Sequence, residues 1–136
     1  MKSGAIATKS VITLRTRDSM LTASKLLKEK AIRHLPVLDD SETLVGVITG
    51  RDIKLASASE AMSLEIHELL YLLDRIEVSK VMTKNPVTVA PNTSVQEAAA
   101  LMVKHEVGCL PVVNAGKLAG IVTDMDMLKL VARGEG

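Results

Sequence analysis

Two short segments of the chain place a hydroxyl group and a carboxylate at the same spacing. They read Thr49-Gly50-Arg51-Asp52 and Thr123-Asp124-Met125-Asp126. Each follows an apolar run typical of a buried strand and begins a stretch typical of a helix. Thr-x-x-Asp at a helix start resembles a capping box, in which the two side chains satisfy free backbone N–H groups. A helix N-terminus also favours anions, and an Asp there can accept hydrogen bonds from ribose hydroxyls, as in dinucleotide-binding folds. The motif alone leaves both interpretations open.

The two segments belong to a long internal repeat. Leu35-Pro36-Val37 matches Leu110-Pro111-Val112, and Thr8-Lys9 matches Thr83-Lys84, at an offset of 75 residues that falls to 74 after the polar turn in each copy. Self-similarity of this length indicates two copies of one supersecondary unit. Because like units tend to pack face to face, we expect them to form one module with a cleft that holds two related sites.

The elements that position the motifs follow from local patterns. The pattern in each copy predicts a strand, a helix, a hairpin of two strands and a second helix. This order of elements indicates an α/β fold. The second helices are expected to begin near Gly50 and Asp124. The other predicted elements are strands at 11–14 and 87–89, helices from 18 or 19 to 30 and from 94 to 105, and hairpins at 35–38 with 45–48 and 110–113 with 118–122.

A further helix is predicted over residues 57–76, between the copies. Met62, Ile66, Leu69, Leu70 and Leu73 fall at helical spacing, and polar residues occupy the other face. This segment contains neither Gly nor Pro. Such a helix either covers one edge of the module or contacts a second subunit, and the pattern does not distinguish these two roles.

Composition excludes several classes of protein. The 136 residues carry a net charge of +1, so no basic surface for nucleic acid is indicated. With no Phe or Trp and one Tyr, the chain also lacks the aromatic stacking platforms of single-strand binders. No segment is long and apolar enough for a signal peptide or a membrane span. A single cysteine excludes an internal disulfide, and we expect a cytoplasmic protein.

Other reactive side chains give weak signals. Cys109 is expected to be a small buried side chain, with a redox-sensing thiol as the alternative. His34, His67 and His105 lie far apart, without metal-ligand spacing. Asp124 and Asp126 alone are weak evidence for a metal. We therefore expect no metal site and no catalytic centre.

Several segments together resemble the cystathionine-β-synthase (CBS) domain, and they do so twice. The second copy carries the resemblance from Val81-Met82-Thr83 through Leu110-Pro111-Val112 to Gly120–Asp126. The first copy does so through His34–Val37 and Gly46–Asp52, although Ala7 stands where the second copy has Met82, and Val11 where it has Pro86. The repeats are expected at 6–56 and 78–131, with the connecting helix at 57–77. Residues 64–73 are similar to CBS pairs of the bacterial acetoin-utilisation type.

The resemblance implies a tandem pair, or Bateman module, that binds AMP, ADP, ATP or S-adenosylmethionine as a regulatory ligand in the cleft between its repeats. Such modules usually form homodimers. Asp52 and Asp126 would then hold ribose hydroxyls, beside Thr49 and Thr123. The adenine pockets would be lined by Ser10, Val11 and Ile12 and by Asn85, Pro86 and Val87. Arg33 and His34 occupy positions that contact phosphate in members of the family.

The two copies are not equal in charge. Arg33, His34 and Arg51 of the first copy are possible phosphate partners, whereas the second copy has Gly108, Cys109 and Met125 there. Arg makes strong bidentate contacts to phosphate oxygens. We therefore interpret the chain as a regulatory adenine-nucleotide-binding module without enzyme activity, acting on its own oligomer or on a protein partner. The alternatives are a structural dimerisation module with vestigial sites and a small enzyme acting on a nucleotide.

Overall fold

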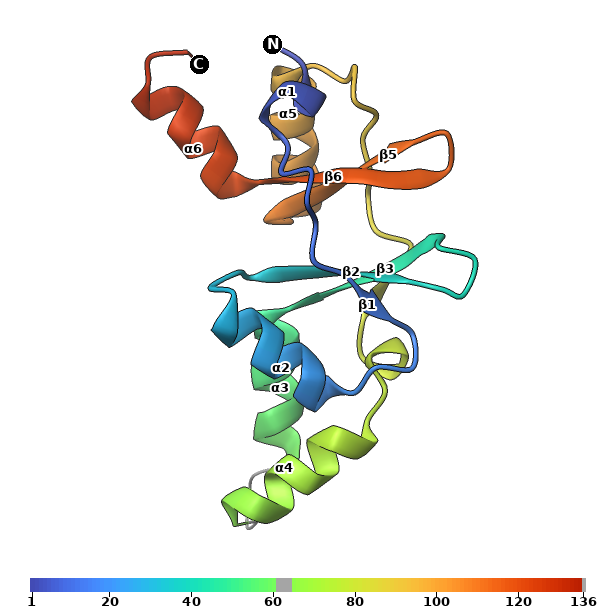
Figure 1. Cartoon of the computed structure of the whole chain (residues 1–136). Helices are drawn as coiled ribbons and strands as arrows, with labels where there is room; N and C mark the ends of the chain where they lie inside the picture. The colour runs from blue at the N-terminus through green and yellow to red at the C-terminus, as the bar shows by residue number, and fades with distance from the viewer. Residues whose placement is uncertain (61–64, 136) are drawn as a thin grey trace. The chain divides into compact units, whose positions relative to one another are not determined.

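The computed structural model describes residues 1–60 and 65–135, and Figure 1 shows how they are arranged into helices and strands. In chain order these are α1 (Ser3–Ile6), β1 (Leu14–Arg15), α2 (Met20–Glu29), β2 (His34–Leu38), β3 (Leu44–Thr49), α3 (Gly50–Glu60), α4 (Ile66–Arg75), the 3₁₀ turn η1 (Val78–Lys80), β4 (Thr83–Lys84), α5 (Val95–His105), β5 (Cys109–Asn114), β6 (Lys117–Thr123) and α6 (Asp124–Ala132). The mixed α/β class is as predicted.

These elements form two compact units. Residues Ile12–Asn85 make the first, here called the continuous unit. Residues Met1–Val11 and Pro86–Gly136 make the second, the discontinuous unit. The opening segment of each sequence repeat thus belongs to the unit that contains the other repeat's hairpin. The repeats at 6–56 and 78–131 are defined by sequence similarity, whereas the compact units are defined by which residues pack together.

The continuous unit is built on a four-stranded sheet in the order β1-β2-β3-β4. Strand β1 runs parallel to β2, and the hairpin β2–β3 and the pair β3–β4 are antiparallel. Apolar residues of the sheet and of helix α2 make its core. Those with almost no exposed surface include Leu14, Met20, Leu35, Val37 and Ile48. The aromatic side chain of this unit, Tyr71, is exposed, so aliphatic residues and methionine fill the core.

Helix α4 covers helices α2 and α3 of the continuous unit. Its Leu73 is buried in the core, and Leu69 packs against the same cluster. The single helix predicted over 57–76 is therefore wrong: residues 57–60 end α3, and a new helix begins at Ile66 after Glu65 adopts an extended backbone. Met62 of the predicted stripe lies outside the described residues. Helix α4 packs on α2 and α3, which agrees with the covering role, one of the two roles that the sequence left open.

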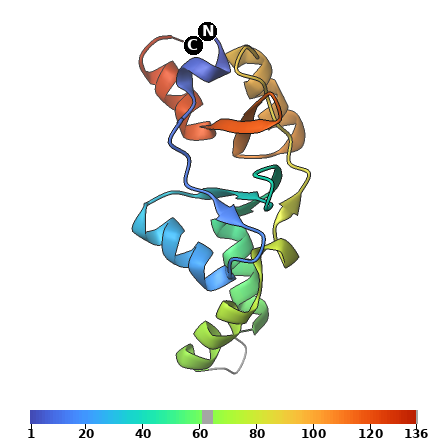
Figure 2. The same cartoon turned by 45° about the vertical axis from the view of Figure 1, so that its right-hand side comes forward.

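The discontinuous unit repeats the same construction around the hairpin β5–β6. Val89 pairs with Val112 in parallel, and Thr8 pairs with Ile121 in antiparallel. Figures 1 and 2 both show the N-terminal segment running beside this hairpin and helix α5. The buried core consists of Val89, Ala98, Met102, Leu110, Val112 and Val122.

Local signals explain most of the boundaries. The side-chain oxygens of Ser19 and Ser94 accept hydrogen bonds from the N–H groups of Thr22 and Glu97, so these serines are the N-caps of α2 and α5. The turn of β5–β6 has positive φ angles at Ala115 and Gly116, as a tight two-residue hairpin requires. The first strands are shorter than predicted, reduced to Leu14–Arg15 and the single bridge at Val89. No helix in the described parts of the chain has the length and apolar character needed to span a bilayer.

Candidate functional site

In the continuous unit, the Thr-x-x-Asp segment forms the junction between strand β3 and helix α3. Thr49 ends the strand, and its N–H and hydroxyl both donate to Oδ2 of Asp52, at 2.8 and 3.1 Å. In return, the N–H of Asp52 donates to the Thr49 hydroxyl oxygen at 3.3 Å. Both residues are partly buried. The turn is thus closed by reciprocal side-chain contacts.

The discontinuous unit contains the same junction between β6 and α6. The N–H and hydroxyl of Thr123 donate to Oδ2 of Asp126 at 2.8 and 3.1 Å, and the Asp126 N–H donates to the Thr123 hydroxyl oxygen at 3.3 Å. The two units therefore hold their carboxylates in the same local geometry. The capping box proposed from the sequence is confirmed at both junctions.

Capping uses only one oxygen of each carboxylate. Within residues 1–60 and 65–135, Oδ1 of Asp52 and Oδ1 of Asp126 take part in no hydrogen bond or ion pair. A carboxylate oxygen has lone pairs to accept hydrogen bonds from two neighbouring hydroxyls. The cap and a ribose contact are therefore compatible, and the alternatives that the motif left open do not exclude each other.

The backbone N–H groups at the helix starts are less available than the sequence suggested. The N–H of Gly50 donates to the carbonyl of Arg33 at 3.2 Å, and that of Asp124 donates to the carbonyl of Gly108 at 2.9 Å. The N–H groups of Asp52 and Asp126 are engaged in the caps. Each helix start thus offers an anion fewer free N–H groups than the sequence suggested, and a phosphate group would depend largely on side chains.

Strand pairing brings the predicted phosphate partners to the same end of the continuous unit. His34 stands directly opposite Thr49 in the β2–β3 ladder. Arg33 precedes it, and its carbonyl holds Gly50, so both residues flank the Thr-x-x-Asp turn. The Arg33 and Arg51 side chains are exposed, and His34 is half-buried. Strand pairing and chain connection thus place these three residues in or beside the Thr49–Asp52 turn, and a contact of their side chains with phosphate stays a prediction.

The matching end of the discontinuous unit is less basic. Cys109 stands opposite Thr123, and Gly108 takes the position of Arg33. Met125 replaces Arg51 and is exposed. Cys109 is buried, as expected for a small apolar residue. The charge asymmetry seen in the sequence is thus present in three dimensions.

The residues predicted to line adenine pockets are divided between the two units. Ser10, Val11, Pro86 and Val87 belong to the discontinuous unit, whereas Ile12 and Asn85 belong to the continuous one. Ile12 and Val87 pack against the cores of their own units. The contact of these segments with a ligand stays a prediction.

The described part of the chain contains no group of three or more His, Cys, Asp or Glu side chains placed to hold a metal ion. His67 and His105 are exposed on helices.

Sequence reasoning missed one cavity, which is lined by residues of the discontinuous unit only. None of its lining residues belongs to the Thr-x-x-Asp junctions. The signal for it was present in the sequence: Ala7 stands where the second copy has Met82. A small residue matched with a large one in an internal repeat points to space that is filled in one copy and open in the other.

Comparison with known proteins gives a consistent result. The CBS domain model matches residues 4–59 and 78–133. A CBS domain-containing protein of Dictyostelium discoideum is 37% identical over 129 residues, which cover 94% of this chain and 89% of that protein. A homoserine O-acetyltransferase of Methanococcoides burtonii is 32% identical over 93% of this chain, but the match spans only 23% of that enzyme.

Three solved structures share the fold over nearly the whole chain. A Vibrio cholerae protein assigned to acetoin utilisation has a TM-score of 0.81 and 31% identity, covering 98% of this chain and 91% of that one. The CBS domain pair of protein MJ0100, in complex with 5′-methylthioadenosine and S-adenosyl-L-methionine, has a TM-score of 0.84 and 29% identity, covering 98% of both chains. CBSX2 in complex with AMP has a TM-score of 0.81 and 30% identity, covering 99% of this chain and 98% of that one.

Proposed function

The chain belongs to the CBS domain family, and from that premise we propose that it is a regulatory module that binds an adenosine-containing ligand. The observation that carries the proposal is the duplicated Thr-x-x-Asp turn, in which one oxygen of each carboxylate remains available. Relatives of the same fold bind AMP, or 5′-methylthioadenosine and S-adenosylmethionine. These ligands share the adenosine group, and we assign that group to this chain's ligand.

Each candidate site residue has a proposed role. Oδ1 of Asp52 and Oδ1 of Asp126 accept hydrogen bonds from the 2′- and 3′-hydroxyls of ribose, while Oδ2 holds the helix start in place. Thr49 and Thr123 keep the two carboxylates oriented. Ser10, Val11, Ile12, Asn85, Pro86 and Val87 line the adenine pockets.

The charge asymmetry separates the two sites by ligand. Arg33, His34 and Arg51 surround the Asp52 turn, so this site is suited to a phosphorylated adenosine such as AMP, ADP or ATP. The Asp126 turn has Asp124 and Met125 beside it, and a second carboxylate disfavours phosphate. This site is suited to an adenosine whose 5′ substituent carries no phosphate, such as S-adenosylmethionine.

The output is regulatory rather than catalytic. The enzyme relative is matched over less than a quarter of its length, so the shared part is a module rather than the enzyme as a whole. A ligand can shift a conformational equilibrium only by binding one state better than another. We propose that occupancy changes the assembly of this chain with itself or with a protein partner.

A homodimer is the assembly that we propose. On helix α6, Met125, Leu128 and Val131 recur every third residue, and 47%, 60% and 67% of their surfaces are exposed. These three residues define an apolar stripe on a helix whose Leu130 is turned into the core. A symmetric pair of such stripes would remove both from water in one self-complementary contact.

The second candidate function is a structural dimerisation module with vestigial ligand sites. It is favoured by the completeness of both capping boxes, since the Thr and Asp side chains have a structural role without any ligand. The two candidates differ in one measurable respect, which is whether an adenosine ligand stabilises the fold.

The experiment is thermal unfolding of the chain in the presence of AMP, ADP, ATP, S-adenosylmethionine and NAD, followed by calorimetric titration of each compound that stabilises it. At a ligand concentration 100 times the dissociation constant, linkage adds about 2.7 kcal/mol to the free energy of unfolding. GTP at the same concentration is the matched control for non-specific effects of phosphate and magnesium. If no adenosine compound raises the melting temperature at millimolar concentration, the sites are vestigial and the structural function is correct.

A further inference from the structure

The two units differ where their opening segments cross the hairpin. In the continuous unit, Met82 lies on Gly46 of strand β3, so closely that a Cβ at position 46 would overlap the methionine side chain. In the discontinuous unit, the matching residues are Ala7 and Gly120, and a Cβ at position 120 would lie 3.1 Å from the Ala7 methyl group. The place filled by methionine in one unit has only a methyl group in the other.

A second replacement enlarges the same place. In each hairpin the ladder shifts register by one residue, after Val37 in β2 and after Val112 in β5. The extra residue on the opposing strand is Val45 in the continuous unit, where it packs against the core. In the discontinuous unit it is Ala119, which is exposed. Two large side chains are thus replaced by alanine at neighbouring positions.

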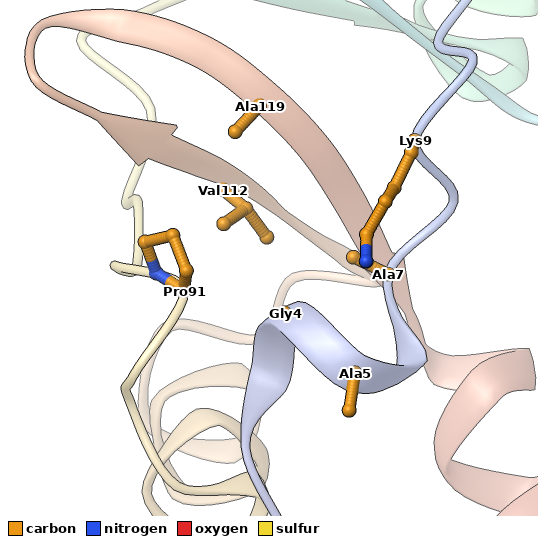
Figure 3. Close-up of a pocket in the computed structure, with 7 residues that line it drawn as sticks. All are labelled: Gly4, Ala5, Ala7, Lys9, Pro91, Val112 and Ala119. Atoms are coloured by element: carbon orange, nitrogen blue, oxygen red, sulfur yellow. The ribbon is translucent and has the colours of Figure 1, made fainter.

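The result is a cavity of about 350 Å³, within the range of small-molecule sites. It is lined by Gly4, Ala5, Ala7, Lys9, Pro91, Val112 and Ala119. Figure 3 shows the Lys9 side chain extending toward Ala7 on one side of the cavity, with Pro91 on the other. The close approach of helix α1 to Pro91 fixes this wall, because the Gly4 N–H donates to the Pro91 carbonyl at 2.9 Å.

The lining combines apolar surface with one positive charge. Lys9 is its only ionisable side chain, and within the described residues Lys9 forms no ion pair. The lining offers no carboxylate to accept hydrogen bonds from ribose, so this cavity does not suit a nucleoside. An apolar wall beside an ammonium group suits a molecule with a hydrocarbon chain and a single anionic end.

We infer that this cavity binds a short, unbranched aliphatic carboxylate. Its hydrocarbon chain lies against Val112, Ala119 and Pro91, in the place that the unbranched side chain of Met82 fills in the other unit. Its carboxylate pairs with the ammonium group of Lys9. Bound there, it joins the opening segment to the hairpin, next to the pairing of Thr8 with Ile121. The site is separate from the turns at Asp52 and Asp126 and independent of their proposed function.

The test is a titration of the ¹⁵N-labelled chain with sodium hexanoate, with hexan-1-ol as the uncharged comparison. We expect saturable shifts of amide resonances at residues 4–9, 112 and 119, with a dissociation constant of about 1 mM, as befits a ligand of this size. Shifts that do not saturate by about 10 mM hexanoate, or that centre on Thr123 and Asp126, would overturn the inference.

Variants locate the site. Ala7→Met and Ala119→Val introduce the residues of the other unit and should each abolish the saturable shifts, whereas Ala100→Met, at an exposed position of α5, should leave them unchanged. Lys9→Gln should weaken hexanoate about two- to fivefold, the size expected for an exposed ion pair, and leave hexan-1-ol unaffected. Unchanged hexanoate binding in both filling variants contradicts the assignment. The response to adenosine compounds should persist in all four variants, so failure here is distinct from failure of the nucleotide sites.

Discussion

Thr49 donates both its backbone N–H and its hydroxyl to a single oxygen of Asp52. The carboxylate thus caps helix α3 with Oδ2, and Oδ1 has no partner within the described residues. A substitution of Asp52 can therefore separate the helix cap, made by Oδ2, from the proposed ribose contact, made by Oδ1. An amide keeps an acceptor for the cap, whereas its NH₂ group cannot accept a hydrogen bond from ribose.

Asp52→Ala should lower both stability and affinity. Loss of the cap should cost about 1 kcal/mol of unfolding free energy, and loss of the ribose contact should weaken a phosphorylated adenosine by roughly one to two decades. Asp52→Asn should retain most of the stability and lose the affinity. Chemical denaturation and calorimetric titration of each variant measure the two effects. If Asp52→Asn binds as well as the unchanged chain, the ribose role of Asp52 is wrong.

The same pair of measurements ranks the two sites. Asp126→Ala should weaken binding of AMP, ADP or ATP less than Asp52→Ala does, because Arg33 and Arg51 flank the Asp52 turn within its own unit. The losses of stability should be similar, since the two caps have the same hydrogen-bond distances. Greater damage to phosphorylated ligands from Asp126→Ala would mean that the basic residues near Asp52 do not select them.

The buried hydroxyl of Ser3 lowers the stability of the discontinuous unit. Its side chain is fully buried, and its hydroxyl has no hydrogen-bond partner in the described structure. The matching residue of the continuous unit is Val78, also fully buried. Ser3→Val should raise the free energy of unfolding by about 1 to 2 kcal/mol, as measured in urea. Val78→Ser is the reverse control and should destabilise; a stabilising Val78→Ser would contradict the argument.

Leu73 tests the role of helix α4 as a cover. The side chain is 4% exposed and contacts the core of the continuous unit, so Leu73→Ala should cost about 2 to 5 kcal/mol. Ile66, on the same helix, is 63% exposed, and Ile66→Ala should change stability by less than about 0.5 kcal/mol. Equal effects of the two substitutions on the urea midpoint would show that α4 contributes little as a cover.

Leu128 tests the proposed dimer. Light scattering at tens of micromolar protein should give twice the chain mass of 14.6 kDa, and Leu128→Glu should reduce it to that of one chain, because a buried unpaired carboxylate is costly. Ile66→Glu, at an exposed apolar position of α4, is the matched control and should remain dimeric. A dimer that survives Leu128→Glu and dissociates with Ile66→Glu would place the interface on α4 instead.

Local patterns predicted most of the elements, and tertiary packing decided the rest. The helix starts at Gly50 and Asp124, the hairpins and the serine caps follow from residues close in sequence. The break before Ile66 has no Gly or Pro signal, because Leu69 and Leu73 set the direction of the new helix through distant contacts.

Local sequence patterns also did not predict the exchange of opening segments, in which each one packs in the unit that holds the other repeat's hairpin. Thr8-Lys9 and Thr83-Lys84 are identical dipeptides, so nothing near them indicates which hairpin each will join. Strand pairing sets Arg33 and His34 beside the turn, and their role as site residues stays a prediction. The motif does not show which carboxylate oxygen accepts the capping hydrogen bonds. That Asp52 uses only Oδ2 is seen in the structure alone.

The exchange has a consequence for the order of events during synthesis. The continuous unit includes η1 and β4, so all its strands and helices have been synthesised by residue 85. The discontinuous unit pairs Thr8 with Ile121, more than a hundred residues apart, and contacts of this separation form slowly. The segment around Thr8 is therefore made before its partner and is among the last to find its place. Until strand β6 has been made, the N-terminal residues wait without their partner, and a chaperone or protease could recognise the nascent chain there.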